Sequence, residues 1–150
     1  MRDGVSQSEI ARKLHISRQA VNQSVQTIPV RITEALNDAA KLSRVEPRII
    51  DSVKGILLGH SREFQADVVI TMHPKTGLRV WYQHNLGRCK ICASKKECKS
   101  VLLKTIDVLG VSLTDKEKDL DPSKLASLAF SKTFGIEYHP RTRLDTRFKA

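Results

Sequence analysis

Residues 66–84 read ADVVITMHPKTGLRVWYQH, and this stretch decides the fold class. Two runs rich in apolar and β-branched residues, 66–73 and 78–84, flank the turn 74–77, which holds Pro and Gly. Such runs on either side of a short turn are typical of an antiparallel β-hairpin. The sequence therefore predicts a hairpin at the centre of the chain.

The preceding segment, residues 48–60 (RIIDSVKGILLGH), adds a third strand in this interpretation. It is β-branched and contains Gly55, where we expect a bulge. The result is a three-stranded antiparallel meander, one face of which should pack against a helix. Trp81 and Tyr82 are neighbours in the last strand and point to opposite faces, so we expect one of the two rings to lie outside the core.

Helical patterns lie on both sides of the predicted sheet. Pro29 suits the first turn of a helix that runs to Ser43. After the sheet, 97–109 has apolar residues at helical spacing and is followed by Gly110. The remaining predictions are a charged linker at 115–121 and a helix that Asp121 caps, with Pro122 at its first position and Gly135 at its end.

The N-terminal segment 6–26, SQSEIARKLHISRQAVNQSVQ, predicts two short helices joined by a tight turn. Ser6 and Ser17 are N-cap residues, and Glu9 stands at the capping-box position of the first helix. Ala11 is small enough to let the helices approach, and His15 stands where the turn needs left-handed backbone. Apolar residues supply the inward face: Ile10, Leu14, Ala20, Val21 and Val25.

The pattern from Gln7 to Val25 resembles the helix-turn-helix of bacterial and archaeal transcription regulators, with His15 in place of the usual Gly. The resemblance covers about twenty residues and implies that helix 18–26 reads the major groove of double-stranded DNA. Arg pairs with guanine, whereas Asn and Gln pair with adenine. The base-reading residues are thus Arg18, Gln19, Asn22 and Gln23, and the phosphate-contacting residues are Ser6, Ser8, Arg12, Lys13 and Ser17.

All three cysteines of the chain fall within ten residues, Cys89, Cys92 and Cys98. Cys-x2-Cys followed five residues later by a third cysteine suits a metal site, and the odd count with no export signal disfavours disulfides. Zinc needs a fourth ligand, for which His84 is the nearest residue and His73 the next. Neighbouring cations offset the charge of such a thiolate site: Arg88, Lys90, Lys95, Lys96 and Lys99.

The same spacing resembles the cluster-binding run of the fumarate–nitrate reduction type oxygen sensors. That resemblance implies a [4Fe–4S] cluster, although this chain has no fourth cysteine. Zinc is the first choice, an iron–sulfur cluster is the second, and free redox-sensing thiols are the third.

Composition restricts the function further. The 150 residues are 40% hydrophobic and carry a net charge of +10, which suggests a polyanionic partner. There is no apolar run long enough to span a membrane, no signal-peptide pattern, and none of the common catalytic motifs; His60 and Glu63 form only an isolated pair. We therefore expect a cytoplasmic protein that is not an enzyme and makes no membrane contact.

Together these features predict an α+β protein with four parts. They are a helix-turn-helix (1–28), a linking helix (29–44), an α+β metal-binding or sensing domain (45–135) and a basic mobile tail (136–150). The predicted function is a sequence-specific, homodimeric DNA-binding transcription regulator. In this interpretation the second domain sets the spacing of the two recognition helices, and its ligand state biases that spacing. The alternative is a metal-binding protein-interaction module without sequence-specific DNA binding.

Overall fold

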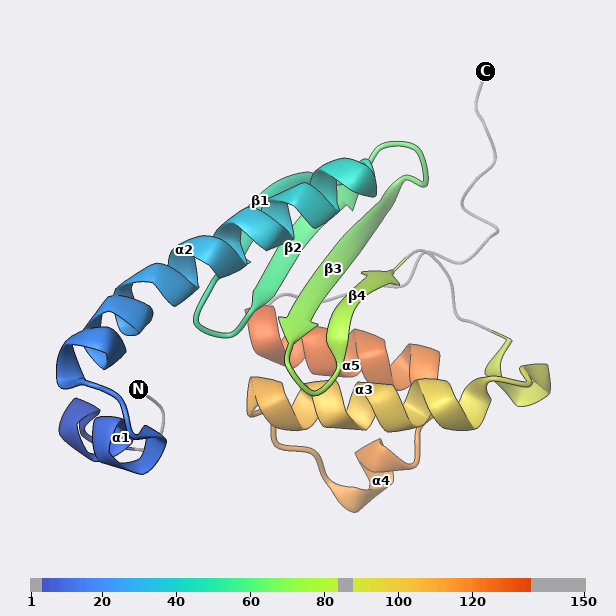
Figure 1. Cartoon of the computed structure of the whole chain (residues 1–150). Helices are drawn as coiled ribbons and strands as arrows, with labels where there is room; N and C mark the ends of the chain where they lie inside the picture. The colour runs from blue at the N-terminus through green and yellow to red at the C-terminus, as the bar shows by residue number, and fades with distance from the viewer. Residues whose placement is uncertain (1–3, 84–87, 136–150) are drawn as a thin grey trace.

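The computed structural model describes residues 4–83 and 88–135 (Figure 1). Within these residues the chain is α+β, as predicted, with one four-stranded antiparallel sheet. In chain order the elements are α1 (Gln7–Leu14), α2 (Arg18–Leu42), β1 (Glu46–Asp51), β2 (Ile56–Ser61), β3 (Ala66–His73), β4 (Gly77–Tyr82), the short 3-10 helix η1 (Cys89–Ile91), α3 (Lys95–Leu109), α4 (Asp115–Lys118) and α5 (Pro122–Phe134).

The sheet is a meander in the order β1-β2-β3-β4, and the predicted hairpin is its second half. The prediction of a single strand over 48–60 is wrong, because this segment contains two strands and a turn. The Asp51 carboxylate accepts a hydrogen bond from the amide of Lys54 at 2.9 Å and so starts the turn. Gly55 ends the turn at φ 63°, a left-handed conformation, rather than forming a bulge.

Helices cover both faces of the sheet (Figure 1). The second half of α2 lies on one face, where Leu36, Ala39 and Ala40 pack against Leu57 and Val68. On the opposite face, α3 and α5 pack against the alternate residues of the central strands. That cluster includes Ile56, Leu58, Val69, Leu102, Ile106, Leu125 and Phe130.

Trp81 and Tyr82 point to opposite faces, as predicted, but both pack against core clusters. The expectation that one ring lies outside the core is wrong, because each face of the sheet has its own helical cover. Trp81 lies 6.0 Å from Phe130, measured between ring centroids. Tyr82 contacts Phe64 edge to face at 5.2 Å.

The helix expected to begin at Pro29 is part of the longer helix α2, so this prediction is wrong. Pro29 lies inside α2, where it has no N–H to donate to the carbonyl of Val25. A single helix therefore crosses the boundary at residue 28 and joins the N-terminal segment to the sheet.

The C-terminal helices end as predicted. Gly110 and Gly135 cap α3 and α5 in the left-handed conformation, at φ 67° and φ 65°. The segment 115–121, expected to be a linker, contains the one-turn helix α4, which a capping box between Thr114 and Glu117 begins.

None of the helices in the described residues is both long and apolar enough to cross a bilayer. The predicted basic tail, 136–150, lies outside the described residues.

Candidate nucleic-acid interface and cysteine cluster

Side-chain caps determine where α1 and α2 begin. The hydroxyl of Ser6 accepts a hydrogen bond from the Glu9 amide at 3.2 Å, and that of Ser17 accepts one from the Ala20 amide at 3.0 Å. Between them, His15 adopts the left-handed conformation at φ 54° and ends α1, as the sequence predicts. The chain therefore changes direction over residues 15–17.

Only two residues in this region are buried. Ala11 of α1 and Val21 of α2 are 7% and 4% exposed, and they hold the two helices together. The side-chain amide of Gln7 donates a hydrogen bond from Nε2 to the side-chain oxygen of Asn22 at 3.4 Å, which also links the two helices at the surface. We call residues 6–30 the arm and residues 31–135 the body.

All nine residues predicted to contact DNA are exposed. Gln19 and Gln23 are four residues apart on α2 and share one face, and Arg18 and Asn22 share the adjacent face. Lys13 pairs with Glu9 at 3.5 Å, so its charge is partly balanced. Among the described residues, Arg12 and Arg18 make no ion pair. The complete set is Ser6, Ser8, Arg12, Lys13, Ser17, Arg18, Gln19, Asn22 and Gln23.

The cysteines lie beside the N-terminal ends of α3 and α5. Cys89 begins η1, Cys92 follows η1 and is exposed, and Cys98 lies in the first half of α3. The thiol of Cys89 donates a hydrogen bond to the hydroxyl of Ser123 in α5, at 3.5 Å. Cys89 and Cys98 are half-buried.

Burial raises the pKa of the Cys98 thiol, and the neighbouring thiols of Cys89 and Cys92 raise it further. The raised pKa leaves less thiolate at neutral pH, so burial and nearby thiols outweigh the cations that surround this segment. One of those cations, Lys95, forms an ion pair with Asp121, in which Nζ lies 2.6 Å from Oδ1. The hydrogen bond from Lys95 lowers the pKa of Asp121 and raises that of Lys95.

In the part of the chain that the structure describes, no group of three or more His, Cys, Asp or Glu side chains is placed to hold a metal ion. The three thiols as placed thus do not form a ligand set. His84 lies outside the described residues. The other histidine considered, His73, accepts a hydrogen bond from the Lys75 amide at Nδ1, at 3.1 Å.

A groove of about 350 Å³ lies between β4 and the beginning of α3. Its walls include Arg79 and Trp81 from the sheet and Glu97, Cys98 and Val101 from the helix. The sequence does not predict this groove, because it depends on α3 packing beside a strand that ends more than ten residues earlier. It brings Cys98 and Trp81 to the same surface.

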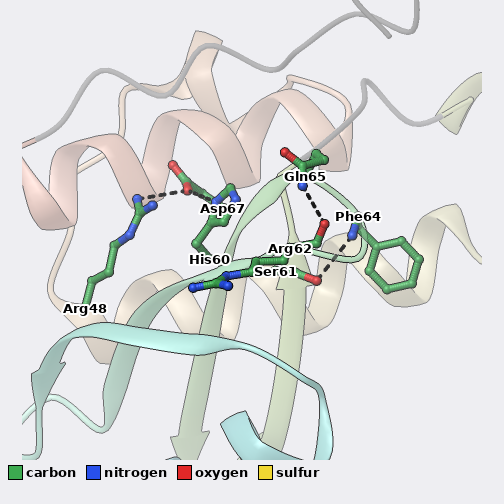
Figure 2. Close-up of polar contacts among 7 residues, drawn as sticks. All are labelled: Arg48, His60, Ser61, Arg62, Phe64, Gln65 and Asp67. Atoms are coloured by element: carbon green, nitrogen blue, oxygen red, sulfur yellow. Dashed lines mark hydrogen bonds and ion pairs between the residues drawn. The ribbon is translucent and has the colours of Figure 1, made fainter. Parts of the chain in front are cut away.

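A polar cluster at one end of the sheet was also not predicted (Figure 2). The carboxylate of Asp67 contacts His60 Nδ1 at 3.0 Å and the guanidinium of Arg48 at 3.3 Å. His60 and Glu63 are close in the sequence, but in the structure the carboxylate of Glu63 contacts the guanidinium of Arg44, at 3.3 Å. His60 and Asp67 face each other across neighbouring strands, and nothing in the local sequence gives that register.

Comparisons with family models, with curated proteins and with solved structures find no match for this chain. The functional interpretation therefore depends on its own residues.

Proposed function

We propose that this protein is a sequence-specific DNA-binding transcription regulator in which the arm is a helix-turn-helix and α2 supplies the recognition helix. The observation that carries the proposal is the arm itself. Two serine caps and a left-handed His15 set the angle between α1 and α2, and the nine residues predicted to contact DNA are all exposed. A polar, amide-rich surface on a protruding helix is suited to base edges in a major groove.

The continuity of α2 supports a mechanical role for the body. Leu36 and Ala40 are fully buried against the sheet, so the C-terminal half of α2 is fixed. The N-terminal half carries Arg18 and Asn22 on the same helix. In this proposal a change in the body moves the reading residues without a flexible joint. The active species is a homodimer that binds double-stranded DNA.

The remaining part of the proposal is a metal held by Cys89, Cys92 and Cys98, with zinc as the first choice and an iron–sulfur cluster as the alternative. What supports it is the chemistry of three thiols within ten residues, two of them half-buried. A bound ion would fix η1 to α3. Because α3 and α5 cover one face of the sheet and α2 covers the other, the ion would stabilise the layer opposite to α2.

DNA reading is tested with Arg18→Ala/Asn22→Ala. A preferred duplex is first selected from a random library with the wild-type protein, and affinities for that duplex and a scrambled one are then measured. We expect the double variant to lose roughly 1–3 kcal/mol of discrimination per lost base contact. Arg62→Ala is the matched control, because it changes the net charge equally at the far end of the sheet. Unchanged discrimination in the double variant would contradict the proposal.

Salt dependence separates this proposal from the alternative, a metal-binding module whose arm contacts a protein. Phosphate contacts make DNA affinity fall steeply as salt rises. We expect that steep fall for the selected duplex, and a smaller slope after Arg12→Ala/Lys13→Ala. If the wild-type protein selects no preferred sequence and its weak binding has no steep salt dependence, the protein-interaction module is favoured.

The metal is tested by elemental analysis and an absorption spectrum of protein purified without oxygen. One zinc per chain in a colourless sample supports the first choice, and a broad brown absorbance lost in air supports the cluster. Cys92→Ser should abolish either signal, whereas Ser94→Ala, two residues away, should leave it. A metal-free wild-type sample that also fails to take up added zinc would overturn this part of the proposal.

A further inference from the structure

One apolar stripe runs along most of α2, but only its ends are covered. Val21, Val25, Ile28, Ile32 and Leu36 follow helical spacing and share one side of the helix. Val21 is 4% exposed because α1 covers it, and Leu36 is 0% exposed because the sheet covers it. Between these ends Val25 is 41% exposed and Ile28 is 51% exposed. The middle of the stripe has no cover within the described residues.

Further apolar side chains of the arm are exposed as well. Leu14, at the end of α1, is 62% exposed, and Ile16, in the turn, is 45% exposed. Single exposed apolar residues are ordinary on protein surfaces. Here five of them, including Val30 at 56% exposed, belong to one arm that has only two buried residues, and α1 itself has eight residues, too few for a stable isolated helix. The arm therefore gains stability from whatever covers the stripe.

Charge indicates what that cover is. The twelve residues 19–30 contain no charged side chain, although 28% of the chain is charged and its net charge is +10. Two copies of so basic a protein repel each other over most of their surfaces. The apolar stripe within this uncharged stretch is where two copies can approach with few like charges in contact. A phosphate backbone or an acidic protein partner seated on the stripe would instead be met by cationic side chains.

We propose that a second copy of this chain covers Val25 and Ile28, so that α2 pairs with α2 of the other copy. Among the predicted base-reading residues, Gln19 and Gln23 lie roughly 140–180° around the helix axis from the stripe, at 100° per residue, whereas Arg18 and Asn22 lie roughly 40° and 80° from it. Pairing through the stripe at Val25 and Ile28 therefore leaves Gln19 and Gln23 open and places Arg18, two helical turns away from Val25, at the edge of the pairing surface. The inference rests on the homodimer of the proposed function, but not on DNA reading.

The size of the surface sets the expected affinity. One face of the arm offers about a dozen residues, whereas a standard interface takes roughly 20–30 from each partner. The dimer is accordingly expected to dissociate in the micromolar range, and dimerisation is expected to be visible as concentration changes. Amides of the arm should exchange more slowly with solvent as the dimer forms, because pairing restrains α1 and the first half of α2.

Sedimentation equilibrium of the full chain without DNA, from low micromolar to several hundred micromolar, tests this surface. We expect the wild-type mass to rise from monomer to dimer, and Val25→Glu/Ile28→Glu to weaken association at least tenfold. The matched control is Leu42→Glu/Val53→Glu, which adds the same charges at side chains 87% and 85% exposed outside the arm. The control should associate like the wild type.

A folding control and a second double variant complete the test. Hydrogen exchange of the sheet amides shows whether each variant keeps the body folded, and Val25→Gln/Ile28→Gln replaces the Glu variant if it does not. A wild-type protein that stays monomeric at every concentration overturns the inference, as does a double variant that dimerises like the wild type. Because no DNA is present, these outcomes are distinct from failure of Arg18→Ala/Asn22→Ala to change duplex discrimination.

Discussion

The arm and the body share one helix but are held together in different ways. In the body, β2 is apolar and is buried on both faces, so that Ile56, Leu57 and Leu58 are each at most 4% exposed. In the arm, burial is limited to Ala11 and Val21. Side-chain caps, the left-handed His15 and the continuation of α2 from the body supply the rest of its order.

The difference bears on the binding surface that we propose for the arm. A region that buries little keeps most of its side chains available, and it depends on a rigid neighbour for its orientation. The body is that neighbour, because Leu36 and Ala40 fix the second half of α2 against the sheet. We expect substitutions in the body to change global stability, and substitutions in the arm to change local opening and binding.

The largest expected effect is in the body. Phe130 is fully buried between α5 and the sheet, so Phe130→Ala should lower the free energy of unfolding by about 3–5 kcal/mol. Phe64→Ala is the matched control, because Phe64 is 50% exposed at the rim, and it should cost clearly less. Urea unfolding followed by the fluorescence of Trp81, the single tryptophan, measures both. An equal decrease in the free energy of unfolding for the two variants would show that the buried core of the body does not dominate stability.

The next effect concerns the point where the arm joins the body. Pro29→Ala restores a backbone donor inside α2, which should stabilise the helix by about 3 kcal/mol. The unfolded chain becomes more flexible without the proline, and this reduces the gain in stability by up to about 1 kcal/mol. The expected result is slower hydrogen exchange over residues 25–33. Pro74→Ala, in an exposed turn, is the control and should leave exchange in α2 unchanged. Faster exchange over 25–33 in Pro29→Ala would mean that Pro29 suits its place in the helix.

Local sequence patterns were sufficient for much of the fold. Caps at Ser6 and Ser17, the left-handed His15, and the glycines that end α3 and α5 all act within a few residues of themselves, and each is predicted correctly. The hairpin of β3 and β4 follows from its turn in the same way. Two of the errors, Pro29 as a helix start and Gly55 as a bulge, concern residues that suit either structure locally. At Pro29 the helix continues from the arm into the body, and at Gly55 the chain forms a turn that begins at Asp51.

The site was predicted less completely, for a different reason. Exposure of Arg18, Asn22 and their neighbours follows from helical periodicity alone. In contrast, the groove beside Cys98 and the contact of His60 with Asp67 join residues from separate elements. Their register depends on how strands and helices pack, and no short motif encodes it. Spacing of cysteines likewise gives the chemistry of a metal site but not the positions of its thiols.

A smaller effect distinguishes the arm from the body directly. Val21→Ala removes two methyl groups from the one α2 side chain of the arm that is buried, and should cost about 1–2 kcal/mol. We expect faster hydrogen exchange in α1 with no change in the amides of β2 and β3. Val68→Ala, the same substitution in the buried sheet, should instead destabilise the whole body. If Val21→Ala accelerates exchange in the sheet to the same extent, the arm and the body unfold as one unit.

The smallest effect tests the ion pair that joins α3 to α5 in the body. The hydrogen bond from Lys95 lowers the pKa of Asp121 below the ordinary value of about 3.9, so the pair stabilises the folded state above that pH and is lost as pH falls through the lowered pKa. Asp121→Asn should therefore lower Tm at neutral pH, and the gap to the wild type should close in acid. Asp115→Asn is the control: Asp115 also pairs with a lysine, but its side chain is 99% exposed, so Tm should barely change. A gap that persists below the lowered pKa would show that Asp121 acts through its position at the N-terminus of α5 rather than through its charge.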